Sequence, residues 1–296
     1  MEPHEVTLSD VHVERSHSLH PDNICRKQYP VVISRFVFHR NDAVDTSDTK
    51  EDFGVDEDGD FVVERRMSSD KLDVITIEHV MGTTLKDVGL QVWLGSLLLA
   101  DYIFGNKNTF QDIRALELGA GPGLASIAMA TVAKQVFCTD IGMEVLETCE
   151  RNAWNNRHLY RDRDAVCVRE LNWMSDSLKK EGAYSWTPSD VEGLTCVQVI
   201  IAADVIYDDT LTDAFFNTVK RLMHHPPPKS LFLSLEKRLN FTLSDLEVAC
   251  PAYDHFCECM NNLQRTQGAL QYDVQRIDTT FPQFLQYERT QQLASS

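Results

Sequence analysis

The sequence predicts an α/β protein whose core is a doubly wound, mostly parallel sheet of seven strands with one antiparallel strand. Apolar β-rich runs alternate with helical patterns from residue 113 to residue 263, and this alternation specifies parallel strands with helices on both faces. The last two runs, 270–277 and 284–289, have no helical pattern between them. They are therefore expected to form a hairpin, which places one antiparallel strand in the sheet. A glycine-rich turn joins the first strand of the series to its helix.

A β-rich extension and a flexible linker are expected before the folded domain. Residues 1–28 are polar and follow no sustained period, which is typical of a disordered arm. Residues 29–40 contain a β-rich run that predicts an accessory strand. Residues 41–60 carry nine acidic side chains and a single lysine, so self-repulsion favours a flexible acidic linker. The folded domain is expected over 61–290, followed by a tail over 291–296.

The elements of the domain follow one another in a regular order. Two antiparallel strands are expected first, at 61–64 and 73–80, and then an apolar helix at 89–103. The parallel strands have apolar, β-rich sequences and are expected at 113–118, 134–140, 165–171, 196–203 and 230–236. Amphipathic patterns predict the later helices at 143–156, 210–223 and 245–263. Pro251 should kink or split the last of them.

Composition and charge argue against several classes of protein. Hydrophobic residues make up 43% of the chain, as in most globular proteins, and the net charge is −17. An acidic chain argues against nonspecific binding of nucleic acid and suits a lysine-rich protein partner, although solubility alone also explains the charge. Neither a membrane span nor a signal peptide is expected.

No metal site is expected from the cysteines and histidines. The eight cysteines are scattered through strand and helix patterns without a C-x-x-C pair. Cys257 and Cys259 are close in the sequence, but a helical context points them to different faces. Free thiols in a reducing compartment, without a zinc site, are the expectation. The four histidines in residues 1–28 also lack the spacing of metal ligands.

The glycine-rich turn predicts a ligand site. Gly119, Gly121 and Gly123 occupy alternate positions, and an acidic residue, Glu117, precedes them. Glycine permits positive φ angles and lets a ligand approach the bare backbone. The helix that follows adds unpaired N–H groups and the positive end of its dipole. This combination is suited to the polar part of a nucleotide-like ligand.

The spacing of the turn favours one kind of cofactor. The dinucleotide fingerprint G-x-G-x-x-G places its third glycine one residue later than this chain does. The next strand ends at Asp140, and an acid in that position can hydrogen-bond ribose hydroxyls. A merely structural turn remains the alternative for the glycines alone. With Asp140 included, a cofactor site is the better interpretation.

Further candidate residues fall at the same edge of the predicted sheet. Trp173 follows the third parallel strand, and Asp204 follows the fourth. Ligands of doubly wound sheets bind at the carboxyl ends of the strands. The glycine turn, Asp140, Trp173 and Asp204 are therefore expected to surround one site.

Five motifs in a fixed order carry a family resemblance: Gln91-Val-Trp93, Leu116-Glu-Leu-Gly-Ala-Gly121, Asp140, Leu171-Asn-Trp173 and Ala203-Asp-Val-Ile-Tyr207. As a set they resemble family 16 of the seven-strand S-adenosylmethionine-dependent methyltransferases, which consists largely of protein-lysine methyltransferases. Two further stretches narrow the resemblance to one member of that family: Glu236-Lys-Arg-Leu-Asn-Phe and Ala252-Tyr-Asp-His-Phe. The resemblance covers about residues 61–290 and implies a Rossmann-like fold.

The resemblance also implies roles for individual residues. S-adenosyl-L-methionine is the implied cofactor, and its binding residues are implied to be Trp93, Glu117, Gly119, Ala120, Gly121, Asp140, Trp173 and Ala203. Asp204 and Tyr207 match the motif [D/E]-x-x-[Y/F] and are the implied catalytic residues at the point where a substrate lysine enters. From the residues alone, either tryptophan could instead belong to the core. The family often carries Asp where this chain has Asn172.

The chemistry of methyl transfer to lysine requires mainly placement and deprotonation. An in-line displacement is accelerated largely by proximity and orientation. A free lysine has a pKa of about 10.4, so only a few molecules in ten thousand are neutral at pH 7. A partly dry pocket lowers that pKa, while Asp204 can hold the ammonium as it arrives. The chain lacks the consecutive prolines of [N/D]-P-P-Y enzymes, which disfavours methylation of adenine or of glutamine amides.

The leading hypothesis is a monomeric protein-lysine N-methyltransferase that acts on a non-histone protein, with the lysine in a basic context. A small-molecule methyltransferase and a catalytically inactive binding module of the same fold remain alternatives. An NAD-dependent oxidoreductase is disfavoured by the glycine spacing. Neither nucleic acid nor membrane is expected as a direct partner. The family resemblance favours the nucleus as the location, with the cytoplasm as the alternative.

Overall fold

The computed structural model describes residues 6–8, 18–19, 29–39, 72–238, 240–241, 248–265, 271–290 and 293–295. The predicted acidic linker at 41–60 and the predicted strand at 61–64 lie outside these ranges. Within the predicted arm, two short strands are described, β1 (Val6–Leu8) and β2 (Ser18–Leu19).

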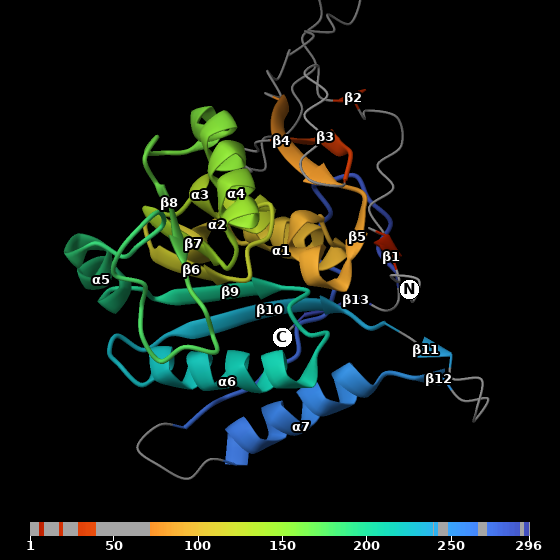
Figure 1. The fold of residues 1–296 in the computed structure, drawn as a ribbon, viewed down its shortest axis with the longest axis vertical. Coiled ribbons are helices and arrows are strands. Elements are labelled where there is room, and N and C mark those ends of the chain that lie inside the picture. The colour runs from red at the N-terminus through yellow and green to blue at the C-terminus, as the bar shows by residue number, and fades with distance from the viewer. Residues whose placement is uncertain are drawn as a thin grey trace, which may run out of the picture.

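A mostly parallel sheet forms the centre of the molecule (Figure 1). Its order is β13-β10-β9-β6-β7-β8, in which β13 alone runs antiparallel to its neighbour. The strands are β6 (Arg114–Leu118), β7 (Gln135–Asp140), β8 (Val166–Glu170), β9 (Val199–Ala203), β10 (Ser230–Glu236) and β13 (Leu293–Ser295). The predicted α/β class, with parallel strands and one antiparallel strand, is confirmed, but the antiparallel strand β13 lies within 291–296, which was predicted to be a tail.

The predicted number of seven strands is wrong, because the described residues supply five parallel strands and the short β13. Of the described residues, neither 271–277 nor 284–289 forms a strand of this sheet. The backbone N–H groups of Phe284 and Leu285 instead donate to Asp101 Oδ1, at 2.8 and 2.9 Å. A buried carboxylate thus takes donors that a strand would offer to a neighbour.

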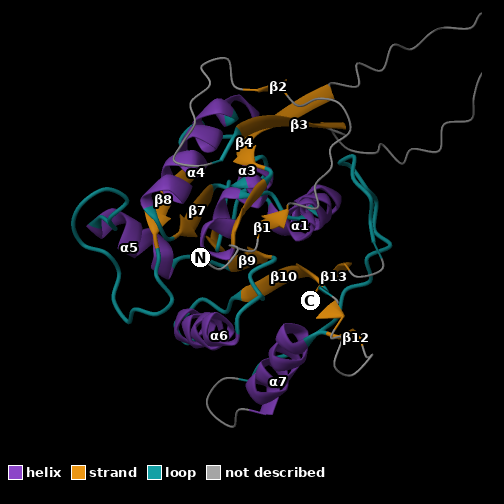
Figure 2. Ribbon diagram, turned by 45° about the vertical axis from the view of Figure 1, so that its right-hand side comes forward, coloured by secondary structure: helices purple, strands orange, loops and turns teal. Residues whose placement is uncertain are grey.

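Helices cover both faces of the sheet (Figure 2). On one face lie α1 (Leu94–Gly105), α3 (Leu124–Ala130) and α4 (Met143–Asn155). On the other lie α6 (Asp209–Met223) and α7 (Pro251–Arg265). Short helices α2 (Lys107–Phe110) and α5 (Pro188–Thr195), with 3-10 turns η1 (Leu85–Leu90) and η2 (Arg157–Leu159), complete the described set. Two large apolar clusters fill the space between the layers, one on each face of the sheet, and a smaller third cluster lies between α4 and the sheet.

Two helices differ from their predicted bounds. The single helix expected at 89–103 is divided into η1 and α1, because Trp93 is extended and stands at the N-terminal cap of α1. The helix expected at 245–263 begins at Pro251 instead of bending there. Proline is well tolerated in the first turn, where its missing N–H would have no helical partner.

A hairpin-like pair of strands packs beside the main sheet. Strand β4 (Leu72–Val80) pairs in antiparallel register with β3 (Val31–His39), so that Val31 faces Val80. Phe36 and Ile75 from this pair are buried in the core that α1 also fills. The predicted strand at 73–80 therefore exists, but the partner described for it is β3. Shorter pairs lie outside the main sheet. Strand β2 pairs with β3, and β11 (Asn240–Phe241) with β12 (Val248–Ala249), over two residues each. Strand β1 pairs with β5 (Gly82–Thr84) over three residues.

The α1 region is unusually apolar. Among the residues that the structure describes, Leu85–Gly105 is long and apolar enough by composition to cross a membrane, and 72% of its apolar 18-residue window is buried inside the fold. Leu97, Leu98 and Ile103 are fully buried in the core. Helix α1, the second part of this stretch, supplies much of the apolar cluster on its face of the sheet.

Candidate active site

A cavity of about 180 Å³ opens where β6, β7 and β9 end. The ten residues singled out from the sequence all line it: Trp93, Glu117, Gly119, Ala120, Gly121, Asp140, Trp173, Ala203, Asp204 and Tyr207. The fold therefore brings together residues that are separated by up to about 110 positions in the chain. The role of each residue stays a prediction, whereas their common location at the cavity is a feature of the structure.

Glycine is required at Gly119 and at Gly123 of the β6–α3 turn for different structural reasons. Gly119, Gly121 and Gly123 all have positive φ angles, of 71°, 53° and 90°. A side chain at Gly119 would come within 2.7 Å of Val205 and 3.2 Å of the Trp173 ring. At Gly123 it would meet the Cys149 sulfur at 2.9 Å, on the α4 side of the turn. Gly119 thus keeps the cavity open, whereas Gly123 allows the turn to pack against α4.

Asp140 is held at the end of β7 by the backbone. Its Oδ2 accepts from the N–H of Gly121 and its Oδ1 from the N–H of Ile141, both at 2.7 Å. Burial raises the pKa of Asp140 to about 6, against the effect of these two donors. Each carboxylate oxygen can accept a second hydrogen bond, so Asp140 can also bind hydroxyl groups of a ligand in the cavity.

Glu117 lies deeper, on β6. Its side chain is buried, and Ser126 of α3 donates a short hydrogen bond to Oε2. Burial raises the pKa of Glu117 to about 8, and the nearby Asp140 carboxylate adds to this shift. Glu117 thus joins β6 to α3 at the floor of the cavity, and its proton is retained near neutral pH.

Both tryptophans lie at the cavity and neither is fully buried. The Nε1–H of Trp93 donates to the Val88 carbonyl at 3.1 Å, and the guanidinium of Arg238 lies 4.2 Å from its ring centre. Trp173 packs edge-on against Phe215, with ring centres 5.4 Å apart. Trp93 and Trp173 both line the cavity, and Trp173 also packs against the edge of the core cluster that contains Phe215, so its ring takes part in both.

The Asp204 carboxylate accepts hydrogen bonds from two backbone N–H groups, which its motif did not predict. Directly after Ala203 at the end of β9, Asp204 has a positive φ of 52°. Its Oδ2 accepts from the N–H of Gly95 at 2.5 Å, and its Oδ1 accepts from the N–H of Glu236 at 2.7 Å. Gly95 is in the first turn of α1, where a carboxylate interacts favourably with the helix dipole. Asp204 therefore connects the ends of β9 and β10 with the start of α1.

Tyr207 stands at the rim of the cavity. Its side chain is partly exposed, and its pKa is raised by burial of the hydroxyl and by the negative charges of Asp140 and Asp208. Arg238 acts in the opposite direction. A neutral hydroxyl at this position can orient a polar ligand group, and the ring can form a wall of the entrance.

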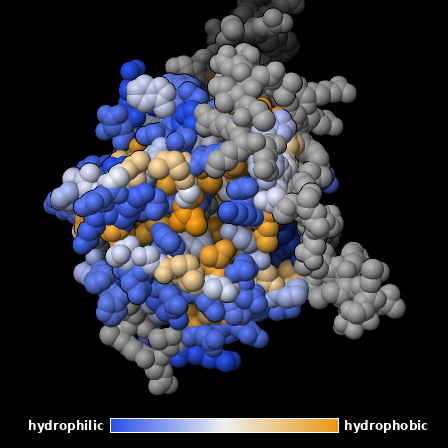
Figure 3. All heavy atoms as spheres, in the orientation of Figure 1, coloured by the Kyte–Doolittle hydropathy of each residue, from blue (hydrophilic) through white to orange (hydrophobic). Residues whose placement is uncertain are grey.

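Sequence reasoning missed the apolar part of the rim. Ile141 and Met174 line the cavity and are large, exposed hydrophobic residues. Each directly follows a residue that was singled out, Asp140 or Trp173, so the carboxyl ends of the strands were the signal that could have found them. On the face shown in Figure 3, apolar residues reach the surface near the centre and are bordered by hydrophilic ones.

These residues define a class of protein. Residues 71–249 match the family model for lysine methyltransferases, and the chain belongs to that family. The resemblance found in the motifs is therefore confirmed.

Several individual proteins are also similar in sequence to this chain. The chain is 47% identical over 227 residues to methyltransferase-like protein 22 of Homo sapiens and 44% identical over 243 residues to that of Mus musculus. These matches cover 75% and 80% of this chain, but 56% and 62% of the relatives' own lengths. Protein-lysine N-methyltransferase EFM3 of Chaetomium thermophilum is 29% identical over 171 residues, which cover 57% of this chain and 47% of that protein.

Proposed function

We propose that this protein is an S-adenosylmethionine-dependent protein-lysine N-methyltransferase. The observation that carries the proposal is the convergence of the glycine turn, Asp140, two tryptophans and Asp204–Tyr207 on one cavity. Membership of the lysine methyltransferase family supports the same activity.

The cavity has the chemical features that S-adenosylmethionine requires. Glycine backbone at positive φ leaves room beside Gly119, where a Cβ would meet Val205 and Trp173. Asp140 supplies a carboxylate for ribose hydroxyls, and the aromatic ring of Trp173 supplies an apolar surface for a flat base. When bound, the cofactor supplies a methyl group that is already activated for transfer. The protein then needs to place a nucleophile in line with that group.

Asp204 and Tyr207 are suited to receive the nucleophile. Both lie after β9 at the cavity, where the chain turns from the sheet towards α6. The two backbone N–H donors hold the Asp204 carboxylate in place, and each of its oxygens can still accept from a lysine ammonium. A partly dry cavity favours release of a proton from that ammonium before transfer. Tyr207 can orient the neutral amine from the rim.

The charge around the entrance favours a basic protein segment. Asp208 and Asp209 are exposed immediately after Tyr207, at the rim of the cavity. Lys86 in the cavity lining and Arg238 over the Trp93 ring carry the opposite charge. Exposed carboxylates attract cationic partners and increase their rate of association. Together with the net charge of −17, this arrangement supports a substrate lysine in a basic context of a non-histone protein. We further propose that the protein acts as a monomer, in the nucleus or the cytoplasm, and without direct binding of nucleic acid.

The decisive experiment is incubation of the purified protein with radiolabelled S-adenosylmethionine and a cell extract, followed by gel separation and mass spectrometry. Label on lysine side chains of a protein band is expected. The matched control is Gly119→Arg, whose side chain would fill the space beside Val205 and Trp173 and should abolish both cofactor binding and labelling.

Other outcomes of that experiment would contradict the proposal. Label recovered only in small molecules would favour a small-molecule methyltransferase. Binding of the cofactor without any transfer, across extracts of several tissues, would favour an inactive binding module. Binding of a nicotinamide dinucleotide in place of S-adenosylmethionine, measured by calorimetry, would overturn the assignment of the class.

A further inference from the structure

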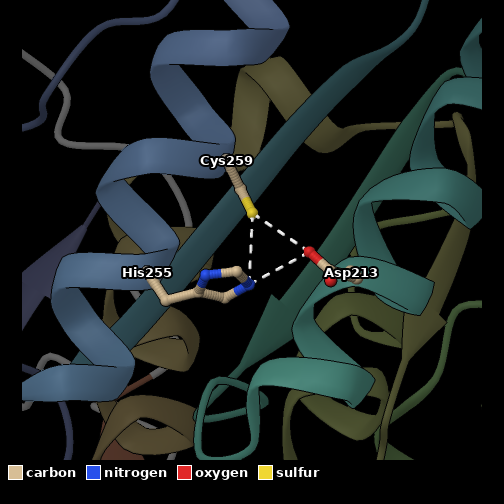
Figure 4. Close-up of side chains that lie close together, drawn as sticks. All are labelled: Asp213, His255 and Cys259. Atoms are coloured by element: carbon tan, nitrogen blue, oxygen red, sulfur yellow. Dashed lines mark hydrogen bonds and ion pairs between the residues drawn. The ribbon is translucent and has the colours of Figure 1, made fainter.

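Three side chains with metal-binding groups meet on the opposite face of the sheet from α1. Asp213 projects from α6, and His255 and Cys259 project from α7 (Figure 4). His255 and Cys259 are four residues apart, so they lie one turn above the other on the same face of the helix. The packing of α7 beside α6 brings that face to Asp213.

The spacing of the three donor atoms matches one face of a tetrahedron around a zinc ion. The Cys259 sulfur lies 3.6 Å from His255 Nε2 and 3.5 Å from Asp213 Oδ1. Bond lengths of about 2.0–2.3 Å in tetrahedral zinc sites place neighbouring donors about 3.3–3.6 Å apart. The remaining separation, from His255 Nε2 to Asp213 Oδ1, is 3.0 Å. It has the length of a hydrogen bond and needs to lengthen by only about 0.3 Å to fit.

The chemistry of the three donors also suits zinc. Sulfur, imidazole nitrogen and carboxylate oxygen are the ligand types that this ion takes in proteins. A thiolate and a carboxylate together balance its two positive charges, and the thiol proton is released on binding. The side chain of Asp213 is 60% exposed and that of His255 is 26% exposed, so water can reach a fourth position. Burial and the Asp213 carboxylate raise the pKa of the Cys259 thiol, Lys220 opposes this shift and Glu258 adds to it, so the metal itself must displace the thiol proton.

We propose that Asp213, His255 and Cys259 form a zinc-binding site that fastens α7 to α6, with water as the fourth ligand. The sequence argued against zinc because Cys257 and Cys259 point to different faces of a helix. Cys257 and Cys259 both pack against the apolar core on this face, and the Cys259 sulfur also contacts His255 and Asp213. The partners of Cys259 come instead from one turn earlier on α7 and from α6.

The site has a structural consequence for the catalytic edge. Helix α6 begins at Asp209, two residues after Tyr207, and Asp213 is only one turn further along. A metal that holds Asp213 against α7 therefore restrains the helix that follows the Asp204–Tyr207 loop. This consequence does not depend on the proposed methyltransferase activity, since the metal site and the cavity share no residue.

The test is titration of the full chain, purified without metal, with Co²⁺ as a spectroscopic substitute for Zn²⁺. One equivalent should produce a thiolate-to-cobalt charge-transfer band together with the visible absorption of tetrahedral cobalt, and one equivalent of Zn²⁺ should remove both. Cys259→Ser should eliminate the charge-transfer band. The matched control Cys196→Ser, at an exposed cysteine, should leave it unchanged.

A second pair of variants tests the imidazole. His255→Ala should weaken Zn²⁺ binding at least about tenfold, as loss of even an outer partner of a metal ligand commonly does. His225→Ala, at an exposed histidine at the end of α6, should have no effect. Zn²⁺ should also raise the melting temperature of the wild type but not that of His255→Ala.

A native circular dichroism spectrum with a cooperative thermal transition serves as the measure of correct folding for every variant, so that the test does not depend on the proposed cofactor. If folded wild-type protein gives no charge-transfer band, the three residues form only a hydrogen-bonded cluster and the proposal is wrong. A band that persists unchanged in folded Cys259→Ser would assign the metal to another cysteine and would equally overturn it.

Discussion

At the scale of single residues, Asp204 combines a position at the cavity with a role in holding the backbone. Its carboxylate accepts from Gly95 and from Glu236, and its own N–H donates to the carbonyl of Ser234 at 2.9 Å. Ser234 in turn donates from its hydroxyl to the Gly95 carbonyl at 2.7 Å. A side chain at Gly95 would come within 2.5 Å of the Asp204 carboxylate, so this position requires glycine.

Replacing Asp204 should therefore reduce stability as well as methyl transfer. Asp204→Ala leaves two backbone donors without their charged partner, which should lower the free energy of unfolding by about 1.5–3 kcal/mol. Asp204→Asn keeps one acceptor and should be less destabilised, while still losing the charge that would receive an ammonium. Urea denaturation and labelled transfer, measured in parallel, separate the two effects. Glu192→Ala, at an exposed acid of α5 outside the cavity lining, is the control. An Asp204→Ala protein as stable as the wild type would show that the two backbone contacts contribute nothing.

Glu117 should make the stability of the ligand-free protein depend on pH. Burial raises its pKa from 4.5 to about 8, so the folded protein keeps a proton that the unfolded chain releases above about pH 4.5. The free energy of unfolding should therefore fall as pH rises from about 4.5 to 8, by at most roughly 1.4 kcal/mol per pH unit from this group.

Glu117→Gln tests this dependence, because glutamine can keep the contact with Ser126 without a titrating proton. The variant should lose stability less steeply than the wild type over that interval and should be the more stable protein at its upper end. Denaturation curves at a series of pH values measure the difference, with the exposed Glu147→Gln as control. Parallel curves for Glu117→Gln and the wild type would contradict the assignment.

At the scale of elements, α4 holds strand β4 through two asparagines instead of through apolar packing alone. Asn152 and Asn156, four residues apart and fully buried, each accept from and donate to one residue of β4. Their partners are the backbone groups of Glu78 and Thr76, at 2.7–2.9 Å. The two amides thus act on the strand edge as a neighbouring strand would. Asn152 also donates to the Pro122 carbonyl at 2.9 Å and so connects β4 to the glycine turn.

Removing one of these amides should destabilise the protein and loosen the turn. Asn152→Ala leaves backbone groups of Glu78 and the carbonyl of Pro122 without a partner, at about 1–3 kcal/mol for each group that stays buried. Chemical denaturation should show this loss, and calorimetry should show weaker binding of S-adenosylhomocysteine. Asn155→Ala, at the exposed neighbour on the same helix, should change neither quantity. Equal effects of the two substitutions would mean that helix propensity, and not the strand contact, is responsible.

At the scale of the whole molecule, α1 connects the cavity to the far end of the chain. Its first turn is held by Asp204, and its buried Asp101 receives the C-terminal segment. Asp101 Oδ2 accepts from Tyr287 and from Arg289, each at 2.8 Å, in addition to the two backbone donors at its other oxygen. A carboxylate with four donors is well compensated for its burial, so this segment is fixed to the core although it forms no strand there.

Removing one partner of the Asp101–Arg289 ion pair should lower the free energy of unfolding substantially. Arg289→Ala removes the positive charge beside a fully buried carboxylate, and breaking a buried pair in this way typically costs about 3–5 kcal/mol. The double variant Asp101→Leu with Arg289→Leu should recover part of the loss, because no uncompensated charge remains. Urea denaturation compares the three proteins with Arg276→Ala, an exposed arginine of the same segment. If Arg289→Ala were as stable as the wild type, the ion pair of Arg289 with Asp101 would not stabilise the fold.

The sequence by itself determined the features that depend on local patterns. Alternation of apolar strands and amphipathic helices identified the five parallel strands and the class of fold. The glycines at 119, 121 and 123, with Asp140 at the next strand end, located the cavity, because carboxyl ends of parallel strands meet at one edge of a sheet.

Only the tertiary structure decided which distant segments share hydrogen bonds. Four contacts join positions that are far apart in the chain. Strand β4 pairs with β3, Phe284 donates to Asp101 instead of joining a strand, Asp204 accepts from Gly95, and Asp213 meets Cys259. Hydrophobic periodicity specifies which face of an element is buried, but it does not specify which polar side chain will meet which backbone group across the core. Those partners depend on tertiary packing, and they fix the positions of the residues at the carboxyl ends of the parallel strands, where the cavity lies.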